Sequence, residues 1–260
     1  MKLIQSRDNP YYKELVKLSR SSRHRSKVGQ TLLDGTHLLD AYLDAGMLPQ
    51  QVLVNSVALG NAEVIALLER ATNIAVTQLD DKLFDQLSEL KSPTGILALI
   101  DITQQDMKME QIRFALLMED IQDSGNLGSM LRSAAAAGCD AAFLSKGCAD
   151  AWSPKVLRAA MGGHFALRIY ERQDLRNIAN EFHGTLLAAS LKATRSLYEC
   201  DLDGNVAFMI GNEGAGLTDE LMGFATQLVT IPIPGKVESL NAAAAAAICL
   251  FEVVRRRNCL

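Results

Sequence analysis

The sequence predicts an α/β protein with a small N-terminal α/β domain and a C-terminal domain built on a parallel sheet. Short apolar runs alternate with helical patterns along the chain, and this alternation is typical of layered α/β folds. A polar stretch without hydrophobic periodicity, TQQDMKMEQ at 103–111, separates two such series. We therefore expect one domain at 1–102, a linker at 103–111 and a second domain at 112–260.

The N-terminal series begins with a polar, basic helical segment. Strands are expected at 31–34, 51–55, 74–77 and 96–100. Helices are expected at 10–21, 36–45, 62–70 and 80–90. Strands and helices that follow one another in this way indicate a two-layer or three-layer α/β unit.

The C-terminal series contains six strand-like runs. They lie at 114–118, 141–144, 166–169, 185–189, 206–210 and 228–233, and a long helix is expected at 239–256. Six strands with covering helices indicate an open, mostly parallel sheet. Ligands of such sheets bind beyond the carboxyl ends of the strands, so the loops at those ends are the first places to search.

Composition fits an ordinary globular protein of a reducing compartment. Hydrophobic residues make up 48% and charged residues 22% of the 260 residues, which is usual for soluble domains. The chain starts without an apolar leader-like segment, and the longest apolar run, 242–251, is too short to span a bilayer. Its five cysteines form no C-x-x-C pair, so neither a disulfide framework nor a metal site is indicated. We expect a cytoplasmic protein without a membrane partner.

Positive charge is concentrated at two places although the net charge is −4. The first is a run of six cations between residues 13 and 27: Lys13, Lys17, Arg20, Arg23, Arg25 and Lys27. The second is the triplet Arg255–Arg257. Each cluster has two interpretations, a solvated helix face or helix end that favours cations, and a patch that contacts phosphates. For the triplet the helix end is favoured, and for the first run both interpretations stay open.

Three loops at predicted strand ends carry the polar residues that could do chemistry. Asn126 and Arg132 follow the strand at 114–118, Glu213 lies in a glycine-rich turn after 206–210, and Ser239 and Asn241 precede the last helix. Each also has a purely structural interpretation: Asn126 or Ser239 as a helix cap, Arg132 or Glu213 as a solvated charge. Six consecutive alanines at 242–247 indicate that another element packs very close to the last helix.

Together these loops resemble the SpoU (TrmH) class of the SPOUT RNA methyltransferases. The motifs are Asn-x-Gly-x-x-x-Arg at 126–132, Gly-x-Glu-x-x-Gly-Leu at 211–217 and Ile-Pro…Glu-Ser-Leu-Asn at 231–241. The N-terminal half is similar to that family's substrate-binding domain at Asn9-Pro10, at LDGTHLL (33–39) and at SPTGIL (92–97). Thr94 stands where glutamine is common, and alanines at 242–244 replace a usual Val-Ser, but the polar motif positions are intact.

The resemblance implies a parallel α/β domain threaded into a trefoil knot, an exception to the general absence of knots. It implies a homodimer, with S-adenosylmethionine as cofactor. Gly211, Gly216, Ile231, Ile233 and Leu240 would line the cofactor pocket. The implied reaction is methyl transfer to a ribose 2′-hydroxyl of rRNA or tRNA, with the first basic run as an RNA contact.

The resemblance also implies roles for the five polar residues. Arg132 would contact the hydroxyl or its phosphate and stabilise the developing alkoxide, since an arginine normally stays charged. Asn126 would orient Arg132 or the ribose, and Glu213 would hold Arg132 or the substrate. Ser239 and Asn241 would fix the loop and the nucleotide.

Two other functions are considered beside methyl transfer to RNA. The first is a non-catalytic RNA-binding or ribosome-assembly protein that keeps the fold, which loss of Arg132 or Asn241 would have indicated. The second is a small-molecule methyltransferase. The basic run and the separate N-terminal domain argue against it, because they favour a large anionic substrate.

Overall fold

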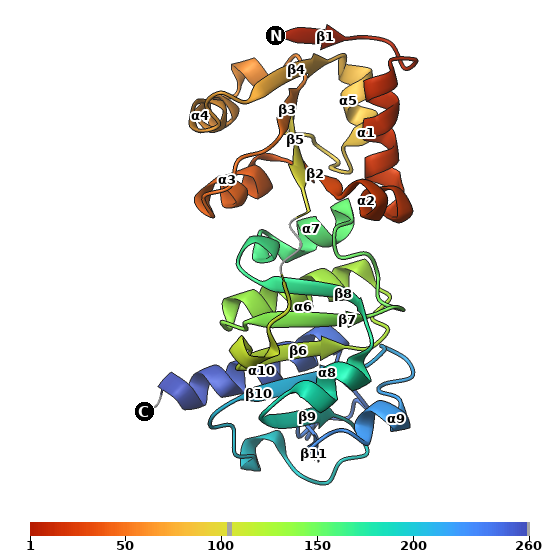
Figure 1. Ribbon diagram of the computed structural model, residues 1–260, viewed down its shortest axis with the longest axis vertical. Helices are drawn as coiled ribbons and strands as arrows, with labels where there is room; N and C mark the ends of the chain where they lie inside the picture. Colours follow the sequence, from red (N-terminus) through yellow and green to blue (C-terminus); the bar gives the residue numbers. More distant parts are fainter. Residues whose placement is uncertain (103–105, 259–260) are drawn as a thin grey trace. The chain divides into compact units, whose positions relative to one another are not determined.

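The computed structural model describes residues 1–102 and 106–258, and these form two compact units. The first unit holds residues 1–102 together with Trp152–Phe165, and the second holds 106–151 and 166–258 (Figure 1). Residues 103–105 of the expected linker lie outside the described residues, and the described part of it contains the 3₁₀ helix η2 (Met109–Gln111). The boundary expected near residue 112 does not foresee that Trp152–Phe165 belongs to the first unit.

The first unit is built on a mixed five-stranded sheet in the order β1-β4-β3-β5-β2. Its strands are β1 (Lys2–Ile4), β2 (Gln30–Asp34), β3 (Gln51–Val54), β4 (Ala75–Leu79) and β5 (Ile96–Asp101). β1, β4 and β3 are parallel, while β5 runs antiparallel to both β3 and β2. The four expected strands are present, and β1 is an addition that the three-residue segment Lys-Leu-Ile did not indicate.

Helices cover both faces of this sheet, so the unit has three layers (Figure 1). They are α1 (Pro10–Arg20), α2 (Ser22–Val28), α3 (Thr36–Asp44), α4 (Ala62–Arg70) and α5 (Asp81–Leu87), with the 3₁₀ helix η1 (Ala58–Gly60). α1 and α5 share one apolar core, in which Leu15 and Phe84 are fully buried. α3 and α4 lie on the other face. Asn9 begins α1 by accepting hydrogen bonds from two backbone amides, and Pro10 occupies the first helical position, where no amide donor is needed.

A segment from the middle of the chain completes the first unit. α7 (Pro154–Ala160) packs on β2, and the 3₁₀ helix η3 (Gly163–Phe165) follows it. The Thr31 hydroxyl donates to the Trp152 carbonyl over 2.8 Å, and Phe165 meets Tyr42 edge to face with ring centroids 5.0 Å apart. Val156 and Leu157 are fully buried, so apolar burial fixes this segment to the unit.

The second unit is built on a six-stranded sheet in which all neighbours are parallel. The strands are β6 (Phe114–Met118), β7 (Ala141–Ser145), β8 (Arg168–Gln173), β9 (Thr185–Ala189), β10 (Val206–Ile210) and β11 (Gln227–Val229), in the order β11-β9-β10-β6-β7-β8. The parallel sheet predicted from the sequence is confirmed. The strand expected at 228–233 ends at Val229, apart from an isolated bridge at Thr230, and Pro232 has no amide to donate to a ladder.

Helices lie on both faces of this sheet as well. They are α6 (Ser124–Ala136), α8 (Leu175–Glu181), α9 (Asp219–Met222) and α10 (Ala242–Asn258), with η4 (Leu197–Glu199) in a loop. α8 contributes Leu175 and Ile178 to a core with the buried strands, while α6 and α10 lie against each other on the opposite face (Figure 1). Among the described residues, no helix combines the length and the apolar character needed to cross a bilayer.

The alanine run has its close neighbour within the same unit. α10 packs along α6, and both helices present small residues there, with Ala134 and Ala246 fully buried. Small side chains allow two helix backbones to approach, which is the requirement that the run of six alanines indicated.

Candidate active site

Three polar loops meet at one edge of the parallel sheet. They follow β6 (residues 119–123), β10 (residues 211–217, the glycine turn) and β11 (residues 230–241, which lead into α10). Carboxyl ends of parallel strands lie at the same edge, so segments separated by more than a hundred residues in the sequence come together here. This is the edge at which the sequence predicted a site.

A pocket of about 320 Å³ lies beside the glycine turn. All five residues predicted to hold the cofactor line it: Gly211, Gly216, Ile231, Ile233 and Leu240. Glu213 and Ser239 also line it, and α10 contributes Ala242 and Ala245. The pocket has the size of small-molecule sites and combines apolar side chains with the polar groups of a turn.

The glycine turn is shaped by a close approach of its own backbone. A Cβ atom at Gly211 would lie 2.2 Å from the carbonyl carbon of Gly216 and from the amide nitrogen of Leu217. Gly216 has a φ of +73°, a conformation that side chains disfavour. Both glycines are therefore needed for the turn to fold back on itself beside the pocket.

A chain of hydrogen bonds joins the three loops, which we call the Glu213–Asn126–Asn241 bridge. The amide nitrogen Nδ2 of Asn126 donates to the Glu213 carboxylate over 3.0 Å. Nδ2 of Asn241 donates to Oδ1 of Asn126 over 2.8 Å. Oδ1 of Asn241 accepts from the backbone amides of Ala243 and Ala244 and so caps α10. Asn241, and not Ser239, is therefore the cap of α10.

The structure differs from the sequence-based expectation at the starts of α6 and α10. α6 is capped by Asp123, which accepts from the amide of Asn126 over 2.7 Å, and Asn126 is already the third helical residue. α10 begins after Asn241, so Ser239 lies outside the helix and lines the pocket instead. In both cases a carboxylate or amide oxygen two or three residues before the free amides has the right reach.

Glu213 is held as a carboxylate. Besides Asn126, the backbone amides of Gln122 and Asp123 donate to it, at 3.4 and 3.2 Å. Desolvation acts to raise the pKa of Glu213, but the hydrogen bonds from Asn126 and the two amides outweigh it, and the pKa is lowered. Glu213 thus fixes the loop after β6 to the glycine turn.

Arg132 lies on α6, less than two helical turns after Asn126 of the bridge. Its side chain is exposed, and within the described part of the chain it has neither a hydrogen bond nor an ion pair. The contacts of Glu213 go to the loop after β6 and to Asn126, not to Arg132. The bridge places the start of the helix that carries the guanidinium, which remains free to meet a ligand.

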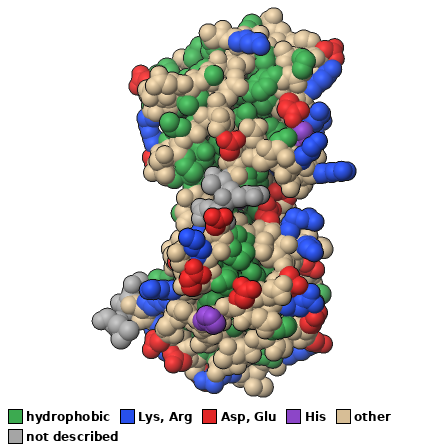
Figure 2. All heavy atoms as spheres, viewed as in Figure 1, with side chains coloured by type: hydrophobic (Ala, Val, Ile, Leu, Met, Phe, Trp, Pro, Cys, Tyr) green, Lys and Arg blue, Asp and Glu red, His purple; other side chains and the backbone are tan. Residues whose placement is uncertain are grey.

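The first basic run lies on α1 and α2 of the first unit. Lysine and arginine side chains gather along the side of the unit formed by these helices (Figures 1 and 2). Arg20, Arg23 and Lys27 are exposed and have no ion-pair partner among the described residues. Lys13 pairs with Asp8 over 2.8 Å and Lys17 with Glu14 over 3.4 Å, both at exposed positions.

Arg25 does not belong to this exposed group. It is buried, and its Nη1 donates to the carbonyls of Leu18 over 2.6 Å and Ser19 over 3.2 Å. These carbonyls are left free at the end of α1, so Arg25 satisfies a helix end. This burial speaks against its assignment as an RNA contact, which stays a prediction.

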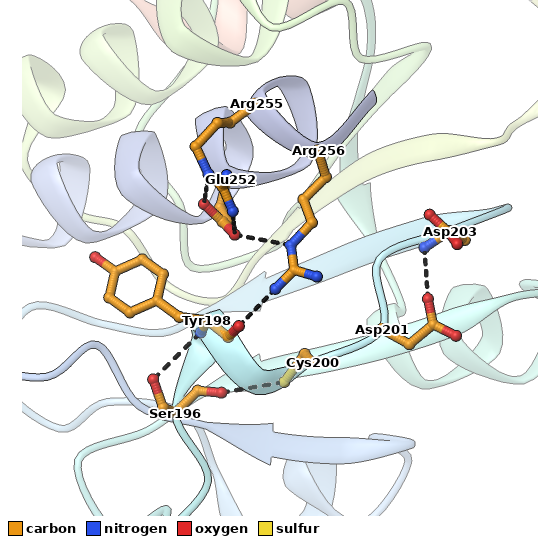
Figure 3. A network of polar contacts seen from close by, with 8 residues as sticks. All are labelled: Ser196, Tyr198, Cys200, Asp201, Asp203, Glu252, Arg255 and Arg256. Atoms are coloured by element: carbon orange, nitrogen blue, oxygen red, sulfur yellow. Dashed lines mark hydrogen bonds and ion pairs between the residues drawn. The ribbon is translucent and has the colours of Figure 1, made fainter. Parts of the chain in front are cut away.

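The arginine triplet at the end of α10 is also engaged within the protein, and Figure 3 shows the contacts of Arg255 and Arg256. The buried carboxylate of Glu252 accepts from Arg255 over 2.7 and 2.8 Å and from Arg256 over 3.0 Å. Arg256 donates to the Tyr198 carbonyl, and Arg257 donates to the Gly204 carbonyl while lying over the Phe114 ring. The triplet ties α10 to the loop after β9, which agrees with the favoured helix-end interpretation.

Comparisons with known proteins identify the family to which these loops belong. The model of the SpoU rRNA Methylase family matches residues 113–251, and that of the MRM3-like substrate binding domain matches residues 9–98. The chain belongs to the SpoU rRNA methylase family. The resemblance seen in the three motifs is thereby confirmed.

Relatives of the family match nearly the whole chain. The 23S rRNA (guanosine(2553)-2′-O)-methyltransferase RlmP of Bacillus subtilis is 32% identical, covering 97% of this chain and 99% of its own length. A solved RNA 2′-O ribose methyltransferase has a TM-score of 0.82 at 30% identity, covering 98% of this chain and 99% of its own. The AdoMet-bound rRNA methyltransferase of Sinorhizobium meliloti has a TM-score of 0.84 at 25% identity and covers 98% of each chain.

Sequence reasoning missed several residues of the SpoU-type site. Asn212 bonds to the loop after β6 and to its own turn, and Glu119 accepts from both the amide and the hydroxyl of Thr218 at 2.8 Å. Gly211 and Glu213, on either side of Asn212, belong to the motif pattern, whereas Asn212 and Glu119 do not. A polar side chain beside a glycine turn would have been the general indication for Asn212.

Proposed function

We propose that this chain transfers a methyl group from S-adenosylmethionine to a ribose 2′-hydroxyl of RNA, with rRNA as the substrate class. The observation that carries the proposal is the pocket beside the glycine turn, joined by the Glu213–Asn126–Asn241 bridge to the helix that bears Arg132. A cofactor pocket and a free guanidinium are thus held by one hydrogen-bonded framework.

The residues of the pocket fit S-adenosylmethionine. Ile231, Ile233 and Leu240 offer an apolar surface for an adenine ring, and Glu213 and Ser239 offer acceptors for its polar groups. The close approach at Gly211 keeps the turn free of side chains on that side. When bound, this cofactor supplies an activated methyl group on a sulfonium.

Arg132 would stabilise the negative charge that develops on the ribose oxygen during methyl transfer. A guanidinium stays protonated near neutral pH, so electrostatic stabilisation suits it better than service as a base. Asn126 and Asn241 are tied to each other and would position α6 and the loop at 230–241, and Ser239 would contact the nucleotide or the cofactor. Correct positioning accounts for much of the rate of such a transfer.

The first unit would bind the RNA. Arg20, Arg23 and Lys27 are exposed cations without intramolecular partners in the described residues, and Lys13 and Lys17 add charge beside them. Neutralising phosphates with such cations releases counterions and drives binding without reading the sequence. In this proposal the first unit selects the RNA and the second performs the chemistry.

We also propose that the protein is a cytoplasmic homodimer whose second unit is knotted. α10 supports the dimer, because Ile248 and Phe251 form part of a stripe that faces away from its buried side, and Phe251 is 46% exposed. A Phe251→Glu variant should shift the mass in size-exclusion chromatography with light scattering from two chains to one. The resemblance to knotted methyltransferases supports the knot.

Two measurements test the function. Calorimetry with the purified protein should detect binding of S-adenosylmethionine. Ribose-methylation mapping of total RNA from a deletion strain should show the loss of one modified nucleotide. A non-catalytic assembly protein would leave every modified site in place, and failure to bind the cofactor would contradict the proposal outright.

A further inference from the structure

Asn212 makes hydrogen bonds in two directions. Its Oδ1 accepts from the backbone amides of Gly214 over 2.9 Å and Ala215 over 3.0 Å, inside the glycine turn. Its Nδ2 donates to the backbone carbonyl of Asp120 over 2.8 Å, in the loop after β6. One half-buried amide therefore closes the turn that lines the pocket and also holds the neighbouring loop.

Asp120, whose carbonyl accepts the hydrogen bond from Asn212, has an unusual backbone conformation. Asp120 has a φ of +54°, which is uncommon for a residue with a side chain. Its amide donates to the Ser145 hydroxyl over 2.9 Å, and that hydroxyl donates back to the Asp120 carboxylate over 2.5 Å. Such a conformation persists only when its surroundings hold it, and Asn212 supplies the contact from the pocket side.

Glu213, the next residue, holds the same loop two and three residues further on. It accepts from the amides of Gln122 and Asp123, while Asp123 caps α6. Adjacent side chains of the glycine turn therefore bond to the carbonyl of Asp120 and to the amides beyond it. Between them they set where α6 begins, and Arg132 lies on that helix.

We propose that Asn212 is a positioning residue for methyl transfer, which couples the shape of the cofactor pocket to the placement of Arg132. This inference rests on the proposed function. Oδ1 of Asn212 holds the turn that lines the pocket, and Nδ2 holds the loop that leads into α6. The effect on cofactor binding and the effect on the rate can therefore be separated by changing one atom.

The test compares Asn212→Asp with Asn212→Ala in the full-length protein. Asn212→Asp keeps an acceptor for Gly214 and Ala215 but loses the donor and places a carboxylate oxygen against the Asp120 carbonyl. We expect its affinity for S-adenosylmethionine, measured by calorimetry, to stay within about threefold of wild type while kcat falls about tenfold or more. Asn212→Ala should lose both, with weaker cofactor binding and a lower kcat.

Asn205→Asp is the matched control, because Asn205 also donates its side-chain amide to a backbone carbonyl, that of His183, over 2.9 Å, at the amino end of β10. Its kcat and cofactor affinity should equal those of wild type. Unchanged kcat in Asn212→Asp would overturn the inference, as would a loss of cofactor affinity in parallel with kcat. If wild type itself neither binds the cofactor nor methylates RNA, the proposed function fails instead.

Discussion

The loops at the sheet edge of the second unit and the basic helices of the first unit carry polar side chains under opposite conditions. At the sheet edge, Glu213, Asn126 and Asn241 are bonded to one another and to backbone amides. On α1 and α2, Arg20 and Arg23 have no such partners within the described chain.

The difference follows from what each region has to do. Stabilising a developing charge requires groups that are already in place, because reorganisation during the reaction would cost part of the benefit. Neutralising a phosphate chain requires only local positive charge, so mobile side chains suffice. Variants in the two regions should therefore differ in kind, with rate effects in the second unit and salt-dependent binding effects in the first.

Arg132→Ala should give the largest effect and test the chemical side of this contrast. We expect kcat to fall by about 10²- to 10³-fold, as when a charge-stabilising donor is removed from an active site. Cofactor affinity from calorimetry should not change, because Arg132 does not line the pocket. Arg132→Lys, which retains a charge but not the guanidinium fork, should recover part of the rate. An alanine variant with wild-type turnover would remove Arg132 from the mechanism.

Asn126→Ala should come next, because it removes the middle of the bridge. Glu213 and Asn241 each lose a hydrogen bond, and α6 is freed to shift. We expect kcat to fall about 10- to 100-fold, the range that a misplacement near 1 Å can produce. Asn177→Ala, an exposed asparagine on α8, is the control. If both variants turned over at the same rate, the sheet-edge loops would not need to be tied together.

A triple change of Arg20, Arg23 and Lys27 to glutamine should act on binding alone. The dissociation constant for RNA should rise about tenfold at low salt, and the slope of log Kd against log salt should fall by roughly 2, at about 0.7 per lost contact with a single strand. kcat at saturating RNA should stay unchanged. Filter binding across a salt series measures the slope.

Arg25→Gln sharpens this result from within the same basic run. Because Arg25 is buried against the end of α1, the variant should lower the melting temperature and leave the salt slope of RNA binding as it is. A changed slope without loss of stability would mean that Arg25 reaches the RNA after all.

Glu252→Gln should have the smallest effect on methylation and show that the arginine triplet has a structural role. Hydrogen bonds from Arg255 and Arg256 lower the pKa of Glu252 against the effect of burial. The carboxylate therefore stabilises the fold above the ordinary glutamate pKa of about 4.3, and this stabilisation is lost as the pH falls through the lower folded pKa. We expect a loss of about 1–2 kcal/mol in the free energy of unfolding at pH 7.

Urea unfolding at several pH values checks this prediction. The difference between wild type and Glu252→Gln should shrink below about pH 4, as the carboxylate gains its proton. Glu181→Gln changes an exposed glutamate at the end of α8 and should leave the free energy of unfolding equal to that of wild type at every pH. A pH-independent difference for Glu252→Gln would mean that the ion pairs do not carry its contribution.

Strong apolar runs gave accurate predictions, because a buried parallel strand needs side chains that are apolar on both faces. Strands β6, β9 and β10 match the expected ranges residue for residue. β1 was missed because three residues carry too little pattern, and α2 because its sequence is polar almost throughout.

The meeting of the three loops could be predicted from the sheet, but their hydrogen bonds could not. Which residue caps α10 depends on where the first helical turn forms, and Ser239 and Asn241 are both good caps by type. The burial of Arg25 was equally hidden, since Arg20, Arg23 and Arg25 look alike in a sequence. Only the carbonyls at the end of α1 distinguish it.

Because Trp152–Phe165 belongs to the first unit, the chain cannot be cut into two independent domains at a single point. The chain leaves the first unit after residue 102, returns to it at Trp152 and leaves it again after Phe165. A fragment that stops at residue 102 would lack the cover of β2 and leave the Thr31 hydroxyl without its carbonyl partner. Each half is thus a poor module for exchange among relatives, and recombination would have to carry the fourteen-residue insert along with the N-terminal partner it fits.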